Sequence, residues 1–548
     1  MPSLKLSASE AELRDRFQQL TGFSDVADLL EITPRQLGYY THRGQVYKTF
    51  EIPKKRGGTR VISAPASKLI IIQRKLNQVL QAVYQPKRVV TGFLPGKNII
   101  WNCEPHVGKR YVLNVDLRDF FPTITFPRVR GMFMAVPYSL PDNVATILAS
   151  ICCFDGRLPQ GAPTSPVISN MICSKLDSQM RALAKKERCH YSRYADDITF
   201  STYQKQFPKA LAVFEASGEG GQLRVGSELA EIINNNGFSV NDKKVRLQHR
   251  SSRQEVTGLV VNTIPNIPRQ YVRQVRAMLH AWRKFDLKLA GEHFFTKYDY
   301  RNRLEMPREV FRQVVKGKID FIGMVKGRTN LTYISLLKQY SQLYPAYKFP
   351  PELYAFEANL AEMRKGVFVL EGDDTQGTGF VVKGLGIVTC NHVLSDNLEA
   401  YRPGDTQRFP VIVKYFDNDR DVAVLEFAHD APKAPEFYES AREPKELDQV
   451  VLLGYPNHVP GATGILYQGK VIGQSTRFGQ PRFLISCEIT QGSSGGPVLD
   501  SDYRVIGIAA NGKEKLGKRG DDLYGVIPIK VLREFLASIK SSSKTSSV

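Results

Sequence analysis

Two adjacent aspartates, Asp196 and Asp197, interrupt the mostly apolar run at 194–200. Apolar residues on both sides of the pair predict a hairpin of two buried strands with the carboxylates at its tip. Unpaired carboxylates in such a place are costly unless a cation neutralises them. A third aspartate, Asp116, ends another mostly apolar run at 111–115. The three aspartates are therefore candidate ligands of divalent metal ions.

Three carboxylates at the ends of buried strands suit nucleotidyl transfer. This reaction uses two hard cations about 3.5 to 4 Å apart, which activate the primer hydroxyl and steady the leaving pyrophosphate. Oxygen ligands favour Mg²⁺, for which Mn²⁺ can substitute. Asp116, Asp196 and Asp197 are the predicted catalytic residues and the predicted ligands of two Mg²⁺ ions.

The positive charge of the chain is confined to its first two-thirds. Residues 1–350 hold 53 Lys and Arg against 28 Asp and Glu, whereas residues 351–548 hold 22 against 26. A basic excess of this size is the electrostatic footprint of a surface that follows phosphate backbones. We therefore expect the first two-thirds to bind nucleic acid and the last third to serve another partner.

At 548 residues the chain is too long for one hydrophobic core, so several domains are predicted. Mixed helices and strands predict an α+β domain over 1–265, followed by basic helices over 266–340. Helical periodicity then stops, and residues 341–365 are predicted to be a linker. Short β-type runs predict an all-β domain over 366–540, and the Ser-rich residues 541–548 a disordered tail.

Local patterns place the elements near these motifs. An amphipathic helix is predicted over 66–84, and strands over 111–126, 190–201 and 254–262. The basic loop at 54–60 contains two glycines and precedes a short predicted strand. Backbone amides and guanidinium groups in such a loop can hold a triphosphate.

The cysteines and the N-terminus indicate a reducing compartment. Seven cysteines occur without a repeated metal-ligand spacing, and the first ten residues lack an apolar signal core. No apolar run approaches the roughly 18 residues that a membrane span needs. We expect a cytoplasmic protein without a membrane partner.

The order of the motifs identifies the polymerase class. The run Leu-Pro-Gln-Gly at 158–161 lies between Asp116 and the aspartate pair and is followed by a predicted helix. This assembly resembles the reverse-transcriptase family, which has an aspartate strand, an LPQG turn and a Tyr-x-Asp-Asp hairpin in this order. The resemblance implies a right-hand polymerase with fingers and palm over 1–265 and a helical thumb over 266–340.

The resemblance also assigns the nucleotide site. Gln160 and Gly161 would line the nucleotide and template site, and Lys55 and Arg60 would meet the incoming triphosphate. Phe121 lies where the family places an aromatic wall under the sugar. Because a 2′-hydroxyl would collide with that wall, deoxynucleotides are the predicted substrates.

Two further runs resemble bacterial retron reverse transcriptases. They are Val-Thr-Gly at 256–258 and Asn-Cys-Glu-Pro-His at 102–106. The resemblance implies a structured noncoding RNA as template and primer, synthesis from a 2′-hydroxyl of that RNA, and a branched RNA–DNA product called msDNA. A role in antiphage defence is implied by the same analogy. The expected RNA contacts are Asn102, His106, Val256, Thr257, Gly258, Arg269, Arg273 and Arg276.

The last third of the chain contains a second catalytic pattern. His392 ends a predicted strand, Asp421 begins another, and Ser494 lies in a glycine-rich turn. These residues supply a base, the group that orients it and a nucleophile. With this order they resemble the trypsin and HtrA-like serine proteases, which implies an active double β-barrel protease. The amides of Gly492 and Ser494 would form the oxyanion hole.

Three further positions bear on activation, disulfide bonding and substrate specificity. Ser493 replaces the aspartate of the zymogen switch, so activation must come from elsewhere. Cys390 has no disulfide partner near the histidine, which fits a cytoplasmic protein. Glu488 lies six residues before Ser494, at the specificity position, and predicts a basic P1 residue in an unknown protein substrate.

Two alternatives remain open at this point. A reverse transcriptase of another bacterial lineage could carry a protease-derived module that binds peptides without cutting them. A viral-type polyprotein would instead use the protease to release the polymerase by cleavage near residues 340–365.

Overall fold

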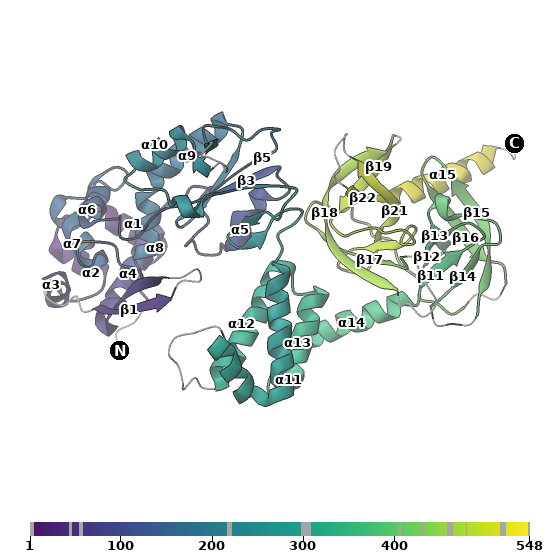
Figure 1. Ribbon diagram of the computed structural model, residues 1–548, viewed down its shortest axis with the longest axis horizontal. Coiled ribbons are helices and arrows are strands. Elements are labelled where there is room, and N and C mark those ends of the chain that lie inside the picture. The colour runs from purple at the N-terminus through teal and green to yellow at the C-terminus, as the bar shows by residue number, and fades with distance from the viewer. Residues whose placement is uncertain are drawn as a thin grey trace. The chain divides into compact units, whose positions relative to one another are not determined.

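The computed structural model describes residues 5–42, 47–53, 58–215, 222–297, 308–403, 405, 407–429, 432–456, 464–477, 479–515 and 522–545. They form two compact units, Met1–Val315 and Lys316–Val548 (Figure 1). The boundary lies inside helix α12 (Arg308–Lys326), upstream of the predicted linker at 341–365. Much of that segment is itself helical, as α14 (Pro351–Arg364). Among the described helices, none combines the length and the hydropathy that a membrane crossing requires.

A four-stranded antiparallel sheet forms the centre of the first unit. Its strand order is β4-β5-β3-β8, and its members are β3 (Tyr111–Asp116), β4 (His190–Tyr194), β5 (Asp197–Thr202) and β8 (Arg246–His249). The side chains of Val115, Ile198 and Phe200 are buried, which explains why these apolar runs become central strands. The strand predicted over 111–126 stops at Asp116, because a turn follows in which Asp119 has a φ of 45°.

Helices and short ribbons accompany this sheet, and all the helices of 1–235 except α5 share one hydrophobic core with it. The helix predicted over 66–84 is confirmed as α4 (Ser67–Val83). The other helices are α1 (Glu10–Gln18), α2 (Phe23–Leu29), α3 (Pro34–His42), α5 (Ile99–Cys103), α6 (Phe126–Met134), α7 (Asp142–Cys152), α8 (Ser165–Ile172), α9 (Ser174–Lys186) and α10 (Ser227–Asn235). The ribbons pair β1 (Tyr47–Pro53) with β2 (Thr59–Pro65), β6 (Ala212–Glu215) with β7 (Gln222–Val225), and β9 (Glu255–Val256) with β10 (Leu259–Val260).

Long helices follow the palm, as the basic periodic segment predicts. They are α11 (Arg269–Lys297), α12 and α13 (Leu331–Leu343). Helix α11 is interrupted at Asp286, whose φ of 69° is not helical. The Asp286 Oδ1 accepts hydrogen bonds from the amides of Lys288 at 2.6 Å and Leu289 at 3.0 Å. Asp286 therefore caps the second half of α11.

The second unit contains two closed six-stranded barrels, as predicted for the all-β region. The first barrel is built from β11 (Val367–Glu371), β12 (Gln376–Val382), β13 (Gly386–Thr389), β14 (Glu399–Tyr401), β15 (Phe409–Asp417) and β16 (Val422–Phe427). The second is built from β17 (Gln449–Gly454), β18 (Ile465–Arg477), β19 (Gln480–Ile485), β20 (Pro497–Leu499), β21 (Val505–Lys515) and β22 (Asp522–Pro528). Helix α15 (Ile529–Thr545) packs on them through Leu532 and Phe535. Residues 541–545 belong to this helix and are not the disordered segment expected from their composition.

The turn between α12 and α13 is bound to the second barrel. The Leu331 amide donates to Gln468 Oε1 at 2.7 Å, and Gln468 Nε2 donates to the Thr329 carbonyl at 2.8 Å. The Thr329 hydroxyl donates to Gln449 Oε1 at 2.8 Å. Gln449 and Gln468 lie on β17 and β18, so these two strands hold the start of α13.

Candidate active sites

The sheet of the first unit brings the three predicted metal ligands to one edge. Asp116 is the last residue of β3 and lies opposite Asp197, the first residue of β5. Asp196 lies in the turn between β4 and β5, and its carbonyl accepts a hydrogen bond from the Leu117 amide at 3.1 Å. The backbone register therefore places all three carboxylates at the same end of two adjacent strands.

Asp116 already has a cationic partner. Lys244 Nζ contacts its Oδ2 at 2.7 Å and its Oδ1 at 2.9 Å, and Asn241 Nδ2 donates to Oδ1 at 3.1 Å. The Asn241 amide also donates to the Asp116 carbonyl at 2.8 Å. These contacts fix the Asp116 carboxylate at the end of β3.

Electrostatics at this edge favour a divalent cation. Desolvation by the surrounding protein, followed by repulsion from Asp196 and Asp116, raises the pKa of Asp197 to about 6. Desolvation and repulsion from Asp116 also raise the pKa of Asp196, against the opposing charges of Lys244 and Arg60. Solvent still reaches the Asp197 side chain. Carboxylates that resist ionisation because of each other, with only oxygen donors, fit the binding of Mg²⁺.

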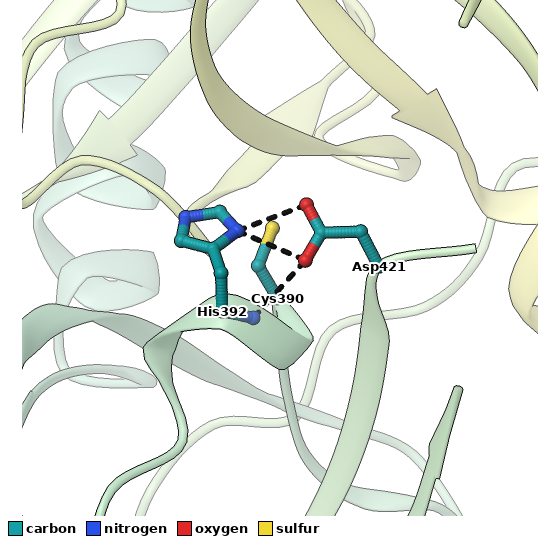
Figure 2. A group of neighbouring side chains, drawn as sticks. All are labelled: Cys390, His392 and Asp421. Atoms are coloured by element: carbon teal, nitrogen blue, oxygen red, sulfur yellow. Dashed lines mark hydrogen bonds and ion pairs between the residues drawn. The ribbon is translucent and has the colours of Figure 1, made fainter. Parts of the chain in front are cut away.

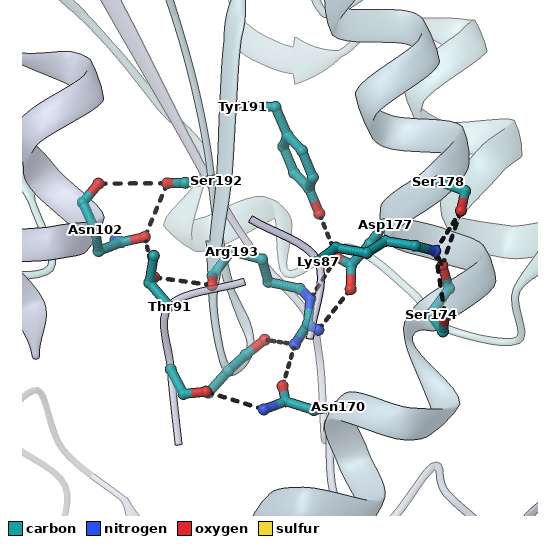
Figure 3. Close-up of polar contacts among 12 residues, drawn as sticks. Lys87, Thr91, Asn102, Asn170, Ser174, Asp177, Ser178, Tyr191, Ser192 and Arg193 are labelled. Carbon is teal, nitrogen blue, oxygen red and sulfur yellow. Dashed lines mark hydrogen bonds and ion pairs between the residues drawn. The ribbon is translucent and has the colours of Figure 1, made fainter. Parts of the chain in front are cut away.

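A buried ion pair supports the hairpin that carries two of these aspartates (Figure 3). Arg193 and Asp177 are both completely buried. Arg193 Nε donates to Asp177 Oδ1 at 2.7 Å, and its Nη2 donates to Oδ2 at 2.8 Å. Tyr191 donates its hydroxyl to the same carboxylate at 2.8 Å. Such a two-point contact fixes the plane of the guanidinium group.

The third nitrogen of Arg193 reaches the catalytic turn itself. Its Nη1 donates to the Ala195 carbonyl and to Asn170 Oδ1, both at 3.1 Å. Asn170 in turn donates to the Gly92 carbonyl at 2.9 Å. A Cβ atom at Gly92 would lie 2.7 Å from the Ala195 amide nitrogen, so only glycine permits this approach. The turn before Asp196 is thus held by a hydrogen bond from Arg193 and by close packing against residue 92.

The LPQG turn is joined to the strand that carries Arg60. The Ser63 amide of β2 donates to the Gln160 carbonyl at 2.8 Å. Gly161 has a φ of 120°, and a Cβ atom there would lie 3.0 Å from the Ser63 carbonyl oxygen. Arg60 is exposed on β2, whereas Lys55 lies outside the described residues. The predicted nucleotide contacts Arg60, Gln160 and Gly161 therefore belong to one connected part of the molecule.

Phe121 occupies a partly exposed position among aromatic rings. Its ring centroid lies 5.3 Å from that of the buried Phe120 and 6.2 Å from that of Phe93. Phe93 lies 6.3 Å from Tyr194, the residue two before Asp196. This arrangement is compatible with a rigid wall beside the aspartates.

Several expected RNA contacts are interior residues. The side chains of Asn102, His106 and Val256 have zero exposure, so none of them can touch RNA in this structure. His106 bonds to Ser201 at 2.7 Å and to Ser192 at 2.8 Å, and burial lowers its pKa to about 3. The run at 102–106 therefore belongs to a structural network, in which the neutral, buried imidazole of His106 joins β4 and β5.

The remaining expected RNA contacts are accessible. Thr257 and Gly258, with φ angles of 46° and 83°, form the tight turn between β9 and β10. Arg269, Arg273 and Arg276 are exposed on α11, at helical spacings that bring them to one face. A single exposed basic face suits contact with a phosphate backbone.

In the second unit, the predicted base and its partner are in contact (Figure 2). His392 lies in the short helix η3 (Asn391–Val393) after β13, and Asp421 immediately precedes β16. The His392 Nδ1 lies 2.9 Å from both carboxylate oxygens of Asp421, and the His392 amide donates to Oδ1 at 3.1 Å. Asp421 has a φ of 57°, a left-handed conformation that aspartate tolerates. This geometry orients the imidazole as a general base requires.

The nucleophile lies in the second barrel and is not engaged. Ser494 is 3% exposed, and its Oγ has no hydrogen-bond partner among the described residues. The turn around it is anchored to β12, because the Thr378 amide donates to the Ser494 carbonyl at 2.8 Å and the Thr378 hydroxyl donates to the Gly492 carbonyl at 2.7 Å. Within the described part of the chain, the amides of Gly492 and Ser494 make no hydrogen bond and remain available as oxyanion donors. Within the described residues, the predicted hydrogen bond between the base His392 and the nucleophile Ser494 is therefore not formed.

The three noteworthy positions around this site have different surroundings. Ser493 is buried, and its amide donates to the Thr490 carbonyl at 2.9 Å. Cys390 is a free, buried thiol beside the His392 and Asp421 pair. The side chain of Glu488 is exposed. The hydroxyl of Ser493 also lies 3.3 Å from the hydroxyl of Thr490, so Ser493 is held by contacts within its own turn.

Comparison with known proteins agrees with this division. Residues 52–262 match the family described as reverse transcriptase (RNA-dependent DNA polymerase), and residues 377–508 match the family described as trypsin-like peptidase domain. This chain joins a reverse transcriptase domain to a trypsin-like peptidase domain.

Several relatives of this chain are retron reverse transcriptases. The retron Mx65 reverse transcriptase of Myxococcus xanthus is 36% identical over 279 residues, which cover 47% of this chain and 62% of that protein. The retron Mx162 reverse transcriptase of the same organism is 34% identical over 339 residues, covering 57% and 64%. The matched segments thus span less than two-thirds of these relatives.

A solved structure aligns with the peptidase domain. It is the Rv3671c protease from M. tuberculosis in its active form, at 24% sequence identity. The alignment covers 34% of this chain and 86% of that chain, with a TM-score of 0.29.

Sequence reasoning missed the residues that support the reverse transcriptase site. Arg193, Asp177 and Lys244 lie outside the recognised motifs. Arg193 leaves one signal, a charged residue within a short strand next to the aspartate pair. Lys244 leaves none, because only the fold brings it to Asp116.

The Arg193 network gives a stability prediction. Replacement of Arg193 by Met removes the cation and leaves Asp177 charged and buried, which should lower the free energy of unfolding by about 3 to 5 kcal/mol. Denaturant unfolding of the full chain measures this change. Arg181→Met, an exposed site on α9, is the matched control and should be nearly neutral. Asp177→Leu added to Arg193→Met should recover part of the loss; equal stability of Arg193→Met and Arg181→Met would contradict the role of the pair.

Proposed function

We propose that this chain is a retron-type RNA-directed DNA polymerase fused to a trypsin-like serine protease effector. It would copy a structured noncoding RNA into the branched RNA–DNA molecule msDNA, using deoxynucleotides, and act in antiphage defence in the cytoplasm. The observation that carries the polymerase part is the convergence of Asp116, Asp196 and Asp197 at one edge of a sheet, in a domain matched to reverse transcriptases. The retron relatives support the choice of template.

The residues of the palm suggest how the reaction would proceed. Asp116, Asp196 and Asp197 would hold two Mg²⁺ ions, which supply the positive charge for activating the primer hydroxyl and stabilising the pyrophosphate. Arg60 on β2 would hold the triphosphate, and the LPQG turn would position β2 through the bond from Ser63 to Gln160. Phe121 would exclude a 2′-hydroxyl. The exposed arginines of α11 would follow the RNA backbone.

The peptidase domain would use an acyl-transfer mechanism. His392 would take the proton of Ser494 at Nε2, while Asp421 holds the Nδ1 proton and stabilises the imidazolium. The amides of Gly492 and Ser494 would bind the developing oxyanion. Ser494 Oγ has no partner among the described residues, and we propose that its contact with His392 forms when a peptide substrate binds.

The contact of α13 with the second barrel suggests how the protease would be controlled. Helix α12 begins in the first unit and ends in the second, and the turn after it is held by Gln449 and Gln468. Nucleic acid bound along the thumb would restrain this turn and, through β17, the barrel that carries Ser494. Release of the RNA or of the DNA copy during infection would then free the protease.

The branched product provides the direct test of the retron assignment. Protein purified with its native genomic neighbourhood should carry DNA covalently joined to RNA, which debranching enzyme converts into separate strands. The product should be absent with Asp196→Asn plus Asp197→Asn, because these changes remove two metal ligands. Asp119→Asn, an aspartate on the turn after β3, is the control that should retain it. Linear DNA in place of the branched product would indicate a reverse transcriptase of another lineage.

Peptide cleavage tests the protease part and its specificity. After removal of bound nucleic acid, the full chain should hydrolyse substrates with Arg at P1 at least about tenfold faster than substrates with Ala. Glu488→Gln should reduce that preference, because it removes the charge proposed to attract the P1 residue. Ser494→Ala should abolish all cleavage. No hydrolysis beyond the Ser494→Ala level would favour the alternative, a protease-derived module that only binds peptides.

A further inference from the structure

Cys390 places a thiol next to the base of the peptidase domain (Figure 2). The ligand atoms of Cys390, His392 and Asp421 all lie within 4.8 Å of one another. One sulfur, one nitrogen and one oxygen at such separations can reach a common metal ion after small side-chain movements, because ligand bonds of about 2.0 to 2.3 Å are typical of zinc. The hydrogen bonds between His392 and Asp421 use only two of these three donors.

We propose that Cys390, His392 and Asp421 form an inhibitory zinc site within the peptidase domain. This inference rests on the proposed protease function, whose regulation it explains. Three protein ligands and a water molecule would complete a tetrahedral site. The thiolate and the carboxylate would together neutralise the charge of Zn²⁺ at a site where only Cys390 is buried.

The donor set selects the metal. Thiolate and imidazole ligands suit Zn²⁺, whereas Mg²⁺ prefers oxygen ligands alone. The same chain would therefore take Mg²⁺ at the aspartates of the palm and Zn²⁺ at the peptidase site. The two metals would not compete, even with Mg²⁺ in large excess.

A backbone carbonyl of the second barrel orients the Cys390 thiol. Its Sγ donates a hydrogen bond to the Ala509 carbonyl at 3.3 Å. On binding, the thiol proton would leave to solvent and the sulfur would turn its electron pair to Zn²⁺.

Zinc at this place would stop catalysis at a defined atom. In the active enzyme, His392 carries a proton on Nδ1, facing Asp421, and accepts the Ser494 proton at Nε2. A metal ion on Nδ1 takes the electron pair there and leaves the ring proton on Nε2. The imidazole then has no free electron pair for Ser494. Asp421 would be diverted from the ring to the metal at the same time.

Spectroscopy of the full-length Ser494→Ala protein tests the site without protease activity. Cobalt(II) replaces zinc in such sites, and a thiolate ligand produces a charge-transfer band in the near ultraviolet. We expect this band at one equivalent of cobalt and its loss on addition of zinc. Cys390→Ala should remove the band and weaken zinc binding at least about 100-fold. Cys487→Ala, a buried cysteine of the second barrel, is the matched control and should keep both.

Enzyme assays separate this inference from the proposed protease function. After digestion of bound nucleic acid, one equivalent of zinc should block Ser494 labelling of the wild type by a serine-hydrolase probe. A zinc-selective chelator should restore the labelling in the presence of Mg²⁺. Cys390→Ala and Cys390→Ser should label but resist zinc, with polymerase activity as the check on folding. A cobalt band without labelling in metal-free protein would uphold the site and contradict the protease function. An unchanged band, or full zinc inhibition, in both Cys390 variants would overturn the zinc site.

Discussion

The catalytic edge of the reverse transcriptase domain depends on one buried ion pair, Arg193 with Asp177 (Figure 3). A charged pair in a protein interior is stable only if its geometry and its other hydrogen bonds are satisfied. Here all three guanidinium nitrogens donate hydrogen bonds, to Asp177, Asn170 and the Ala195 carbonyl. Because Ala195 precedes Asp196, the buried Arg193 cation helps to set the position of a proposed metal ligand.

Both candidate catalytic centres contain carboxylates that favour a positively charged partner, but the partner differs between them. In the palm, like charges and desolvation raise the pKa values of Asp196 and Asp197, so the site favours a hard divalent cation. In the peptidase domain, Asp421 contacts the His392 imidazole. In the proposed mechanism this imidazole becomes positively charged when it takes a proton from Ser494. The buried thiol of Cys390 adds a soft donor to that pair.

The motifs were predictable from sequence, and their supports were not. Strand ends and glycine turns leave local patterns, so Asp116, the hairpin at Asp196 and the two barrels could be predicted. Lys244 and Asp177 act through the fold, at distances that no local pattern encodes. His106 shows the opposite limit, since a motif attributed to RNA contact proved to be a buried bond between strands. Composition predicted a disordered tail from residue 541, whereas α15 continues to Thr545.

The central claim is that bound nucleic acid restrains the protease of the same chain. Labelling of Ser494 by a serine-hydrolase probe, on the purified complex before and after digestion with RNase and DNase, tests it most directly. The account predicts weak labelling of the intact complex and a rise of at least about tenfold after digestion, equivalent to about 1.4 kcal/mol. Strong labelling that digestion leaves unchanged would contradict it.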